Sequence, residues 1–170
     1  MLNDDERVNE ICLKITGFLS DYPLEWSENI LARCYLQAKH RNLIEKLAEE
    51  MKLELYGFLT NKALELYYDI KWQESDIAFI SKGWTDPGFR LGQIIRLSEN
   101  ELEQVKTSSL DFISFCSTQG VAVSGRIRDG VYSLELLDNL YLEGFNRATF
   151  GGTLESIGKC VAQLREVLGK

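Results

Sequence analysis

The sequence predicts a single α+β domain with a largely antiparallel sheet. Apolar residues recur at helical spacing within residues 1–51, alternate strictly over residues 63–72, and flank an Asp129-Gly130 pair further along the chain. These patterns are typical of amphipathic helices, of a half-buried strand and of a tight hairpin. A length of 170 residues fits one domain, with a helical part at residues 1–51 and a part containing the sheet and further helices at residues 52–170.

Two helices are predicted in the N-terminal part. Residues 5–20 place their apolar side chains on one stripe, which is the spacing of an amphipathic helix. Proline disfavours a helical conformation at the residue before it, so Pro23 marks a break, and Ser27 is the expected N-cap of the second helix. The apolar stripe of that helix is interrupted at residues 39–42, where we expect an exposed kink that carries His40.

An antiparallel meander is predicted to follow. In its clearest strand Tyr68 and Ile70 face one way while Asp69 and Lys71 face the other, which indicates one buried and one solvated face. The expected strands of the meander are residues 53–58, 63–72, 77–80 and 89–97, with a loop at residues 82–88.

A helix and a hairpin are predicted next. Ser98 and Glu101 fit a capping box, in which each side chain bonds to a free backbone N–H of the other residue, and the helix behind them should stop near Gly120. The Asp129-Gly130 pair then joins two strands in a hairpin. These two strands are expected at residues 121–128 and 131–137. We expect Thr153 to cap the last helix, because it follows two glycines.

Composition and charge limit the kinds of partner. The chain has 19 Lys and Arg against 26 Asp and Glu, which gives a formal net charge of −7. Because cationic side chains must neutralise phosphates, this balance argues against nucleic acids and anionic membranes and suits a basic protein partner. No apolar run approaches the ~20 residues of a membrane span. The first residues lack the basic and apolar regions of a signal peptide, so a cytoplasmic location is expected.

The residue types from which most catalytic and metal sites are built are scarce. His40 is the single histidine, no glycine-rich phosphate loop is present, and the four cysteines share no motif. We therefore expect no catalytic set, no metal site and no cofactor. The cysteines are expected to be small buried hydrophobic residues. They are Cys12, Cys34, Cys116 and Cys160.

Glu54, Asp69 and Lys71 are the sharpest catalytic candidates. Nucleases of the PD-(D/E)xK kind use an acid-x-lysine pair on a strand, together with an earlier acid, to hold Mg²⁺ and orient water. Asp69 and Lys71 would supply the pair, and Glu54 on the preceding strand would supply the earlier acid. The same spacing also arises on the solvated face of any alternating strand, so both interpretations stay open.

Aromatic residues crowd the predicted meander and its loop. Most of them are expected in the core, because aromatic side chains are favoured in strands and dominate burial. Tyr67 points away from Tyr68 by alternation, and Trp84 lies in the loop before Pro87. Because aromatic residues dominate the energetics of protein interfaces, Tyr67 and Trp84 are the expected partner-binding anchors.

The predicted elements also resemble a known fold. From about Leu43 to Leu168 the chain has a leading helix, a meander that includes residues 64–72 and 77–80, a helix, a hairpin at residues 128–131 and the helix at Thr153. This order resembles the type III secretion chaperone-like fold, which YbjN-like proteins are thought to share. The chain departs from it by an additional N-terminal helix and an additional strand at residues 89–97. The resemblance implies a non-enzymatic, often dimeric protein that binds segments of other polypeptides.

We therefore expect a non-enzymatic, acidic protein-binding module. A chaperone-like protein, an adaptor and an immunity protein that inhibits a basic toxin all belong to this class, and the sequence does not separate them. Two alternatives stay open, namely the metal-dependent nuclease and a small-ligand sensor. The sensor predicts a concave apolar pocket of roughly several hundred Å³ between the sheet and the helices.

Overall fold

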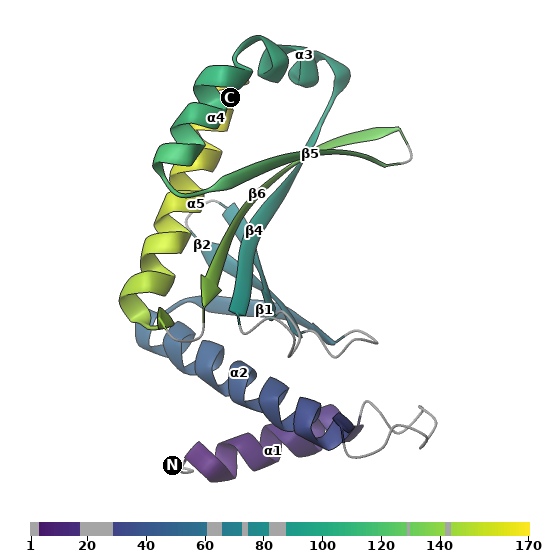
Figure 1. Cartoon of the computed structure of the whole chain (residues 1–170), viewed down its shortest axis with the longest axis vertical. Coiled ribbons are helices and arrows are strands. Elements are labelled where there is room, and N and C mark those ends of the chain that lie inside the picture. The colour runs from purple at the N-terminus through teal and green to yellow at the C-terminus, as the bar shows by residue number, and fades with distance from the viewer. Residues whose placement is uncertain are drawn as a thin grey trace.

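The chain folds into the predicted α+β architecture, with five helices and six strands in the residues that the structure describes (Figure 1). The computed structural model describes residues 4–17, 29–60, 66–72, 75–81, 88–128, 130–141 and 144–170. The helices are α1 (Asp4–Gly17), α2 (Asn29–Met51), α3 (Glu99–Thr107), α4 (Ser109–Thr118) and α5 (Arg147–Val167). The strands are β1 (Glu54–Thr60), β2 (Leu66–Trp72), β3 (Ser75–Ser81), β4 (Gly88–Leu97), β5 (Ala122–Arg128) and β6 (Val131–Tyr141).

All six described strands belong to one antiparallel sheet in the order β1-β2-β3-β4-β6-β5. Strands β1 to β4 form the predicted meander, because each pairs with the next along the chain. The hairpin of β5 and β6 joins this meander through β6, which pairs with β4 over the whole length of β4. The hairpin therefore extends the meander into a single sheet, with β1 and β5 at its two edges.

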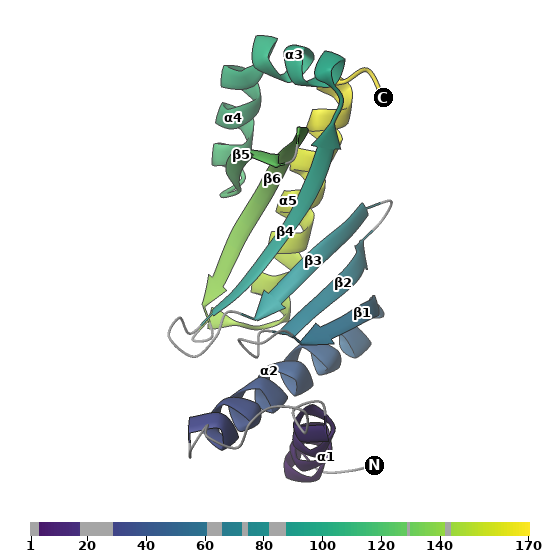
Figure 2. The ribbon, with the colours of Figure 1, turned by 90° about the vertical axis from the view of Figure 1, so that its right-hand side faces the viewer.

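The helices that contact the sheet lie on one of its faces. Figure 1 shows α4 and α5 on one side of the strands and α2 below them, and Figure 2 shows the strands in front of α5. Helix α5 contacts β3, β4 and β6, α2 contacts β1, and α1 packs on α2. The core lies between these helices and the strands. Its largest fully buried side chains are Phe89, Phe112, Phe150, Ile44, Ile70, Ile77, Leu91 and Leu136.

The alternation along β2 explains why the sheet has two unlike faces. Tyr68 and Ile70 are buried whereas Lys71 is exposed, as the sequence pattern predicts. Directly paired residues of neighbouring antiparallel strands lie on the same face, so the register extends this division across all six strands. We call the face packed against the helices the covered face, and the opposite one the open face.

The prediction of an exposed kink at His40 is wrong. Helix α2 is continuous through this position, and the His40 side chain is only 3% exposed, with its ring 4.9 Å from that of Phe89. The apolar stripe looked interrupted because α2 is buried on two sides, against α1 and against the sheet. Polar residues such as His40 and Asn42 are therefore buried as well.

The predicted single helix after Ser98 is two helices. The capping box of Ser98 and Glu101 is present, as predicted, and begins α3. The helix then breaks at Ser108, whose ψ of 14° is not helical, and α4 follows. Hydroxyl side chains compete for backbone groups, and Thr107 does so by donating to the carbonyl oxygen of Glu103 at 2.9 Å. The Thr-Ser-Ser run at residues 107–109 was the signal for this break.

The last helix begins earlier than predicted. Its N-cap is Asn146, whose side-chain oxygen accepts hydrogen bonds from the backbone N–H groups of Ala148 and Thr149 at 2.8 and 3.2 Å. Thr153 is therefore not a cap. It lies inside α5, is 6% exposed, and donates a hydrogen bond to the carboxylate of Asp138 on β6 at 2.9 Å.

Several predicted features lie outside the described residues. They are the end of the first helix at Ser20, the break at Pro23, the cap at Ser27, residues 63–65, the loop at residues 82–87 and Asp129 of the hairpin turn. Gly130 of that turn is described and has the left-handed φ of 75° that favours glycine, and β6 continues to Tyr141, beyond the predicted end at Leu137. None of the helices in the described ranges is long and apolar enough to cross a membrane.

Candidate functional site

The open face of the sheet is not covered by any described helix, as Figures 1 and 2 show from two directions. Four large apolar or aromatic side chains are exposed on it. Ile94 on β4 is 63% exposed, Tyr56 on β1 is 38% exposed, and Val131 and Tyr141 at the two ends of β6 are 44% and 66% exposed. Single exposed apolar residues are common, but several of them on the one uncovered face of a sheet make that face the candidate contact surface.

Charged residues surround Ile94 on the open face. Arg90 and Arg96 lie on the same strand and face, and neither has an ion-pair partner among the described residues. The Nε atom of Arg90 is buried and has no hydrogen-bond partner. Glu135, which is directly opposite Ile94 in the register, is only 7% exposed and forms an ion pair with Arg126 at 2.7 Å. Arg126 therefore neutralises Glu135, whereas Arg90 and Arg96 are cations of β4 that have no such ion pair among the described residues.

The carboxylates and lysine of the nuclease hypothesis share the open face. The register pairs Glu54 with Lys71 directly, and Asp69 lies two residues from Lys71 on the same face of β2. Glu54 and Lys71 are exposed. Within the described residues no group of three or more His, Cys, Asp and Glu is arranged to hold a metal ion. The nuclease interpretation stays a hypothesis that Mg²⁺-dependent cleavage, lost in Lys71→Ala, would test.

Of the two predicted aromatic anchors, Tyr67 is within the described residues and Trp84 is not. Tyr67 belongs to β2, where its backbone pairs with Leu59 and Ile80. Ile80 in turn pairs with Arg90 of β4, which is on the open face. Because paired residues share a face, position 67 is also on the open face. The sequence analysis did not find Ile94 and Tyr141, because their exposure depends on which face the helices cover.

His40 and two of the cysteines are inert core groups. Burial lowers the pKa of His40 to about 4, so its ring is neutral at physiological pH. Cys116 on α4 and Cys160 on α5 are fully buried, which confirms the prediction for these two, and their thiols hydrogen-bond to each other. Burial raises the pKa of Cys160 to about 12, which disfavours the reactive thiolate. The side chains of Cys12 and Cys34 lie outside the description.

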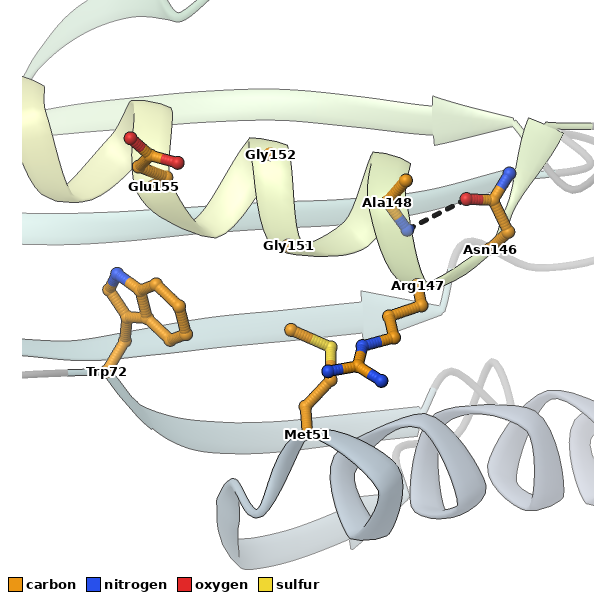
Figure 3. Close-up of a pocket in the computed structure, with 8 residues that line it drawn as sticks. All are labelled: Met51, Trp72, Asn146, Arg147, Ala148, Gly151, Gly152 and Glu155. Atoms are coloured by element: carbon orange, nitrogen blue, oxygen red, sulfur yellow. Dashed lines mark hydrogen bonds between the residues drawn. The ribbon is translucent and has the colours of Figure 1, made fainter.

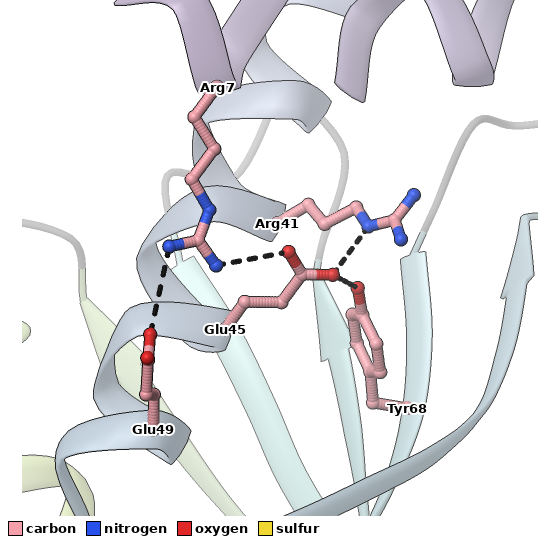
Figure 4. Close-up of polar contacts among 5 residues, drawn as sticks. All are labelled: Arg7, Arg41, Glu45, Glu49 and Tyr68. Atoms are coloured by element: carbon pink, nitrogen blue, oxygen red, sulfur yellow. Dashed lines mark hydrogen bonds and ion pairs between the residues drawn. The ribbon is translucent and has the colours of Figure 1, made fainter. Parts of the chain in front are cut away.

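A polar network joins α1, α2 and β2 at the lower end of the covered face (Figure 4). Glu45 on α2 accepts hydrogen bonds from Arg41 at 2.7 Å and from the hydroxyl of Tyr68 at 2.8 Å. Arg7 on α1 lies 3.6 Å from Glu45 and 3.8 Å from Glu49. Burial, followed by the charge of Glu45, raises the pKa of Tyr68, so the phenol stays protonated as a donor. The network is structural, since it fixes α2 on the sheet and α1 on α2.

A groove of about 610 Å³ lies beside the N-terminal half of α5 (Figure 3). Met51 and Trp72 form its apolar side, and α5 forms the opposite wall. The lining residues of α5 and its cap are Asn146, Arg147, Ala148, Gly151, Gly152 and Glu155. The sequence analysis missed this groove, because Gly151 and Gly152 were interpreted as a helix boundary rather than as a bare stretch of helix surface.

Comparisons with known proteins identify the fold and no function. No protein-family model matches the chain, and no curated protein matches it. The structure is similar to the crystal structure of an uncharacterised protein from Methanothermobacter thermautotrophicus, with a TM-score of 0.63 and 12% sequence identity. The match covers 76% of this chain and 96% of that one. The likeness therefore extends over most of the domain, but at this identity it concerns the fold alone.

Proposed function

We propose that this chain is a non-enzymatic protein-binding module and that the open face of its sheet is the contact surface. The observation that carries the proposal is that this face lacks a covering helix in the described chain while it exposes Ile94, Tyr141 and Tyr56. Antiparallel sheets commonly leave one face solvated, but that face is then mainly polar. Exposed aromatic and aliphatic side chains on a rigid sheet are the groups that anchor protein interfaces.

The charges on the open face specify the contact segment of the partner. Arg90 and Arg96 flank Ile94 without ion-pair partners in the described chain, so a segment with an apolar side chain between carboxylates complements this strand. The acidity that suggested a basic partner is present on both sides of the molecule. The open face carries Glu54, Asp69 and Glu135, and α3 carries Glu99, Glu101 and Glu103. A second, basic surface on the partner that contacts the acidic helix α3 remains a prediction.

The scarcity of catalytic residue types supports the non-enzymatic part of the proposal, since His40 and the described cysteines are buried and unreactive. The resemblance of the element order to the type III secretion chaperone-like fold supports the same class. A chaperone-like protein, an adaptor and an immunity protein remain alternatives within it, and identification of the partner would separate them.

The test is capture from a native-host lysate on the immobilised full chain, compared with an Ile94→Thr/Tyr141→Ser variant. Threonine keeps the β-branched side chain that suits a strand, so the variant should fold. The matched control is Leu110→Thr/Ile113→Thr, which removes two exposed apolar side chains from α4, at 83% and 49% exposure. We expect one stoichiometric partner to be retained by the wild type and the control and to be lost from the open-face variant.

Two outcomes would contradict the proposal. Recovery of no stoichiometric partner would argue against a protein-binding module altogether. Recovery of the same partner by the open-face variant, with loss in the α4 control, would keep the function but move the contact surface to α4.

A further inference from the structure

Two side chains opposite α5, Met51 and Trp72, pack on its backbone along the groove. A Cβ at Gly151 would lie 3.2 Å from the Cε atom of Met51, and a Cβ at Gly158 would lie 3.3 Å from the indole of Trp72. Both side chains therefore pack directly on the bare backbone of α5, seven positions apart. At a rise of about 1.5 Å per residue these contacts are separated by roughly 10 Å along the helix. The groove runs along this stretch of α5 and continues past Met51 to the N-cap residue Asn146.

The groove exists because the helical layer is incomplete at this edge of the sheet. Helix α5 contacts β3, β4 and β6, whereas α2 reaches β1 and ends at Met51. The end of β2, where Trp72 is the last residue, lies between these two helices. Figure 3 shows Trp72 and Met51 along the same side of α5, with Gly151 and Gly152 above them. No side chain of α5 fills the space, since two of the wall residues are glycines.

The charge at the rim of the groove is positive. Arg147 is exposed, has no ion-pair partner in the described parts of the chain, and its side chain lies next to Met51 in Figure 3. Glu155, near the opposite end, is already paired with Lys159 at 2.8 Å. The uncompensated group is therefore a guanidinium, which is the group best suited to a carboxylate. The ring carbons of Trp72 offer an apolar surface, and its buried Nε1–H is a donor without a hydrogen-bond partner among the described residues.

We propose that this groove binds a small amphiphilic carboxylate, with its apolar part between Met51 and Trp72 and its carboxylate at Arg147. The volume of about 610 Å³ falls within the range of small-molecule sites, roughly 300–1,000 Å³. Met51 is unbranched and flexible, which suits an apolar chain or ring of variable shape. The groove lies on the helical side of the sheet, so this inference does not depend on the proposed function of the open face.

The test follows the indole N–H signal of Trp72 by proton–nitrogen correlation NMR of the full chain. The chain has three tryptophans, and the Trp72 signal is assigned as the one that disappears in Trp72→Phe. The probe is octanoate, whose extended chain is similar in length to the separation of the Met51 and Trp72 contacts. Octylammonium, with the same tail and the opposite charge, is the matched probe. We expect octanoate to shift the signal saturably and octylammonium to need about tenfold more for the same shift, because its charge is repelled by Arg147.

Two variants test the roles of the rim and of the bare helix. Arg147→Gln should weaken octanoate binding about three- to fivefold, since an exposed ion pair contributes modestly. Gly152→Leu should abolish saturable binding by filling the groove, and it should fold because a Cβ at Gly152 meets nothing within 4 Å. Lys106→Gln on α3 and Ala162→Leu on the exposed side of α5 remove one charge or add one side chain elsewhere. Both controls should bind octanoate as the wild type does.

Three results would overturn the inference. Equal shifts with octanoate and octylammonium would indicate unspecific apolar contact without a role for Arg147. Unchanged octanoate binding by Gly152→Leu would exclude the groove as the site. Binding of a peptide with a C-terminal leucine carboxylate, more than about tenfold tighter than octanoate, would assign the groove to a polypeptide chain end instead of a small molecule.

Discussion

The two faces of β4 carry similar aliphatic side chains that differ strongly in burial. Leu91 is fully buried under the helices, whereas Ile94, three residues further along the same strand, is 63% exposed. Both are aliphatic, so hydrophobicity does not separate them. The difference is whether a helix covers the face to which the side chain points. A residue on the covered face stabilises the fold, and a residue on the open face is available for contact with another molecule.

The largest expected difference between the two faces is in stability. Phe89→Ala removes a fully buried ring and should lower the free energy of unfolding by about 3–5 kcal/mol. Ile94→Ala, on the same strand but the open face, should lower it by less than about 1 kcal/mol. Urea denaturation followed by circular dichroism measures both. Similar losses in the two variants would show that the open face is covered in the folded chain.

The covered side should also govern the dependence of stability on pH. His40 has a pKa near 6.5 when unfolded and about 4 when folded, because burial disfavours its charged form. Protons therefore bind the unfolded chain preferentially, and stability falls as the pH drops from about 6.5 towards 4. Between pH 7 and pH 5 this residue alone should reduce the free energy of unfolding by about 2 kcal/mol.

Urea denaturation at a series of pH values, for the wild type and His40→Gln, measures this contribution. Carboxylates titrate in both proteins, so the difference between the two curves isolates the histidine. Parallel curves would contradict the burial of His40 in the folded state.

Two asparagines, one in the helix layer and one on the open face, should differ less in their effect on the free energy of unfolding. Asn146 caps α5, the helix that covers the sheet, and Asn139 is exposed on the open face of β6. Asn146→Ala should cost about 1 kcal/mol, because the backbone N–H groups of Ala148 and Thr149 lose their acceptor. Asn139→Ala should stay within about 0.5 kcal/mol. Thermal or urea unfolding compares them, and equal costs would mean that the cap does not stabilise α5.

The smallest expected effect on stability is that of Ile94→Thr/Tyr141→Ser. Both side chains are mostly exposed, at 63% and 66%, so the urea midpoint should change by less than the equivalent of about 1 kcal/mol. A large loss of stability would show that these side chains pack against part of the chain. In that case they could not be interpreted as a contact surface.

Local sequence patterns predicted the elements that depend on neighbouring residues. The alternation that buries Tyr68 and Ile70 and the capping box of Ser98 and Glu101 are both confirmed. The start of α5 was wrong, because two glycines were taken as a boundary while the stronger cap, Asn146, lies further upstream. Packing outweighs the low helix propensity of glycine at this point. Gly151 lies inside the helix, where Met51 approaches its backbone.

Features that depend on contacts between distant segments were not predictable from the sequence. His40 is buried because α2 lies between α1 and the sheet, and no local pattern shows two buried sides of one helix. Ile94 is exposed because β6 pairs with β4 and brings α5 to the opposite face. The groove at Trp72 depends on where α2 ends relative to α5. Such relations arise only when the sheet and the helices are assembled.

The most direct test of the central claim is the affinity of the captured partner for the wild type and for Ile94→Thr/Tyr141→Ser, measured by titration calorimetry. If the open face is the contact surface, affinity should fall at least about tenfold while the urea midpoint stays unchanged, because interface anchors contribute to binding and not to folding. Unchanged affinity in this variant, with both proteins folded, would contradict the account.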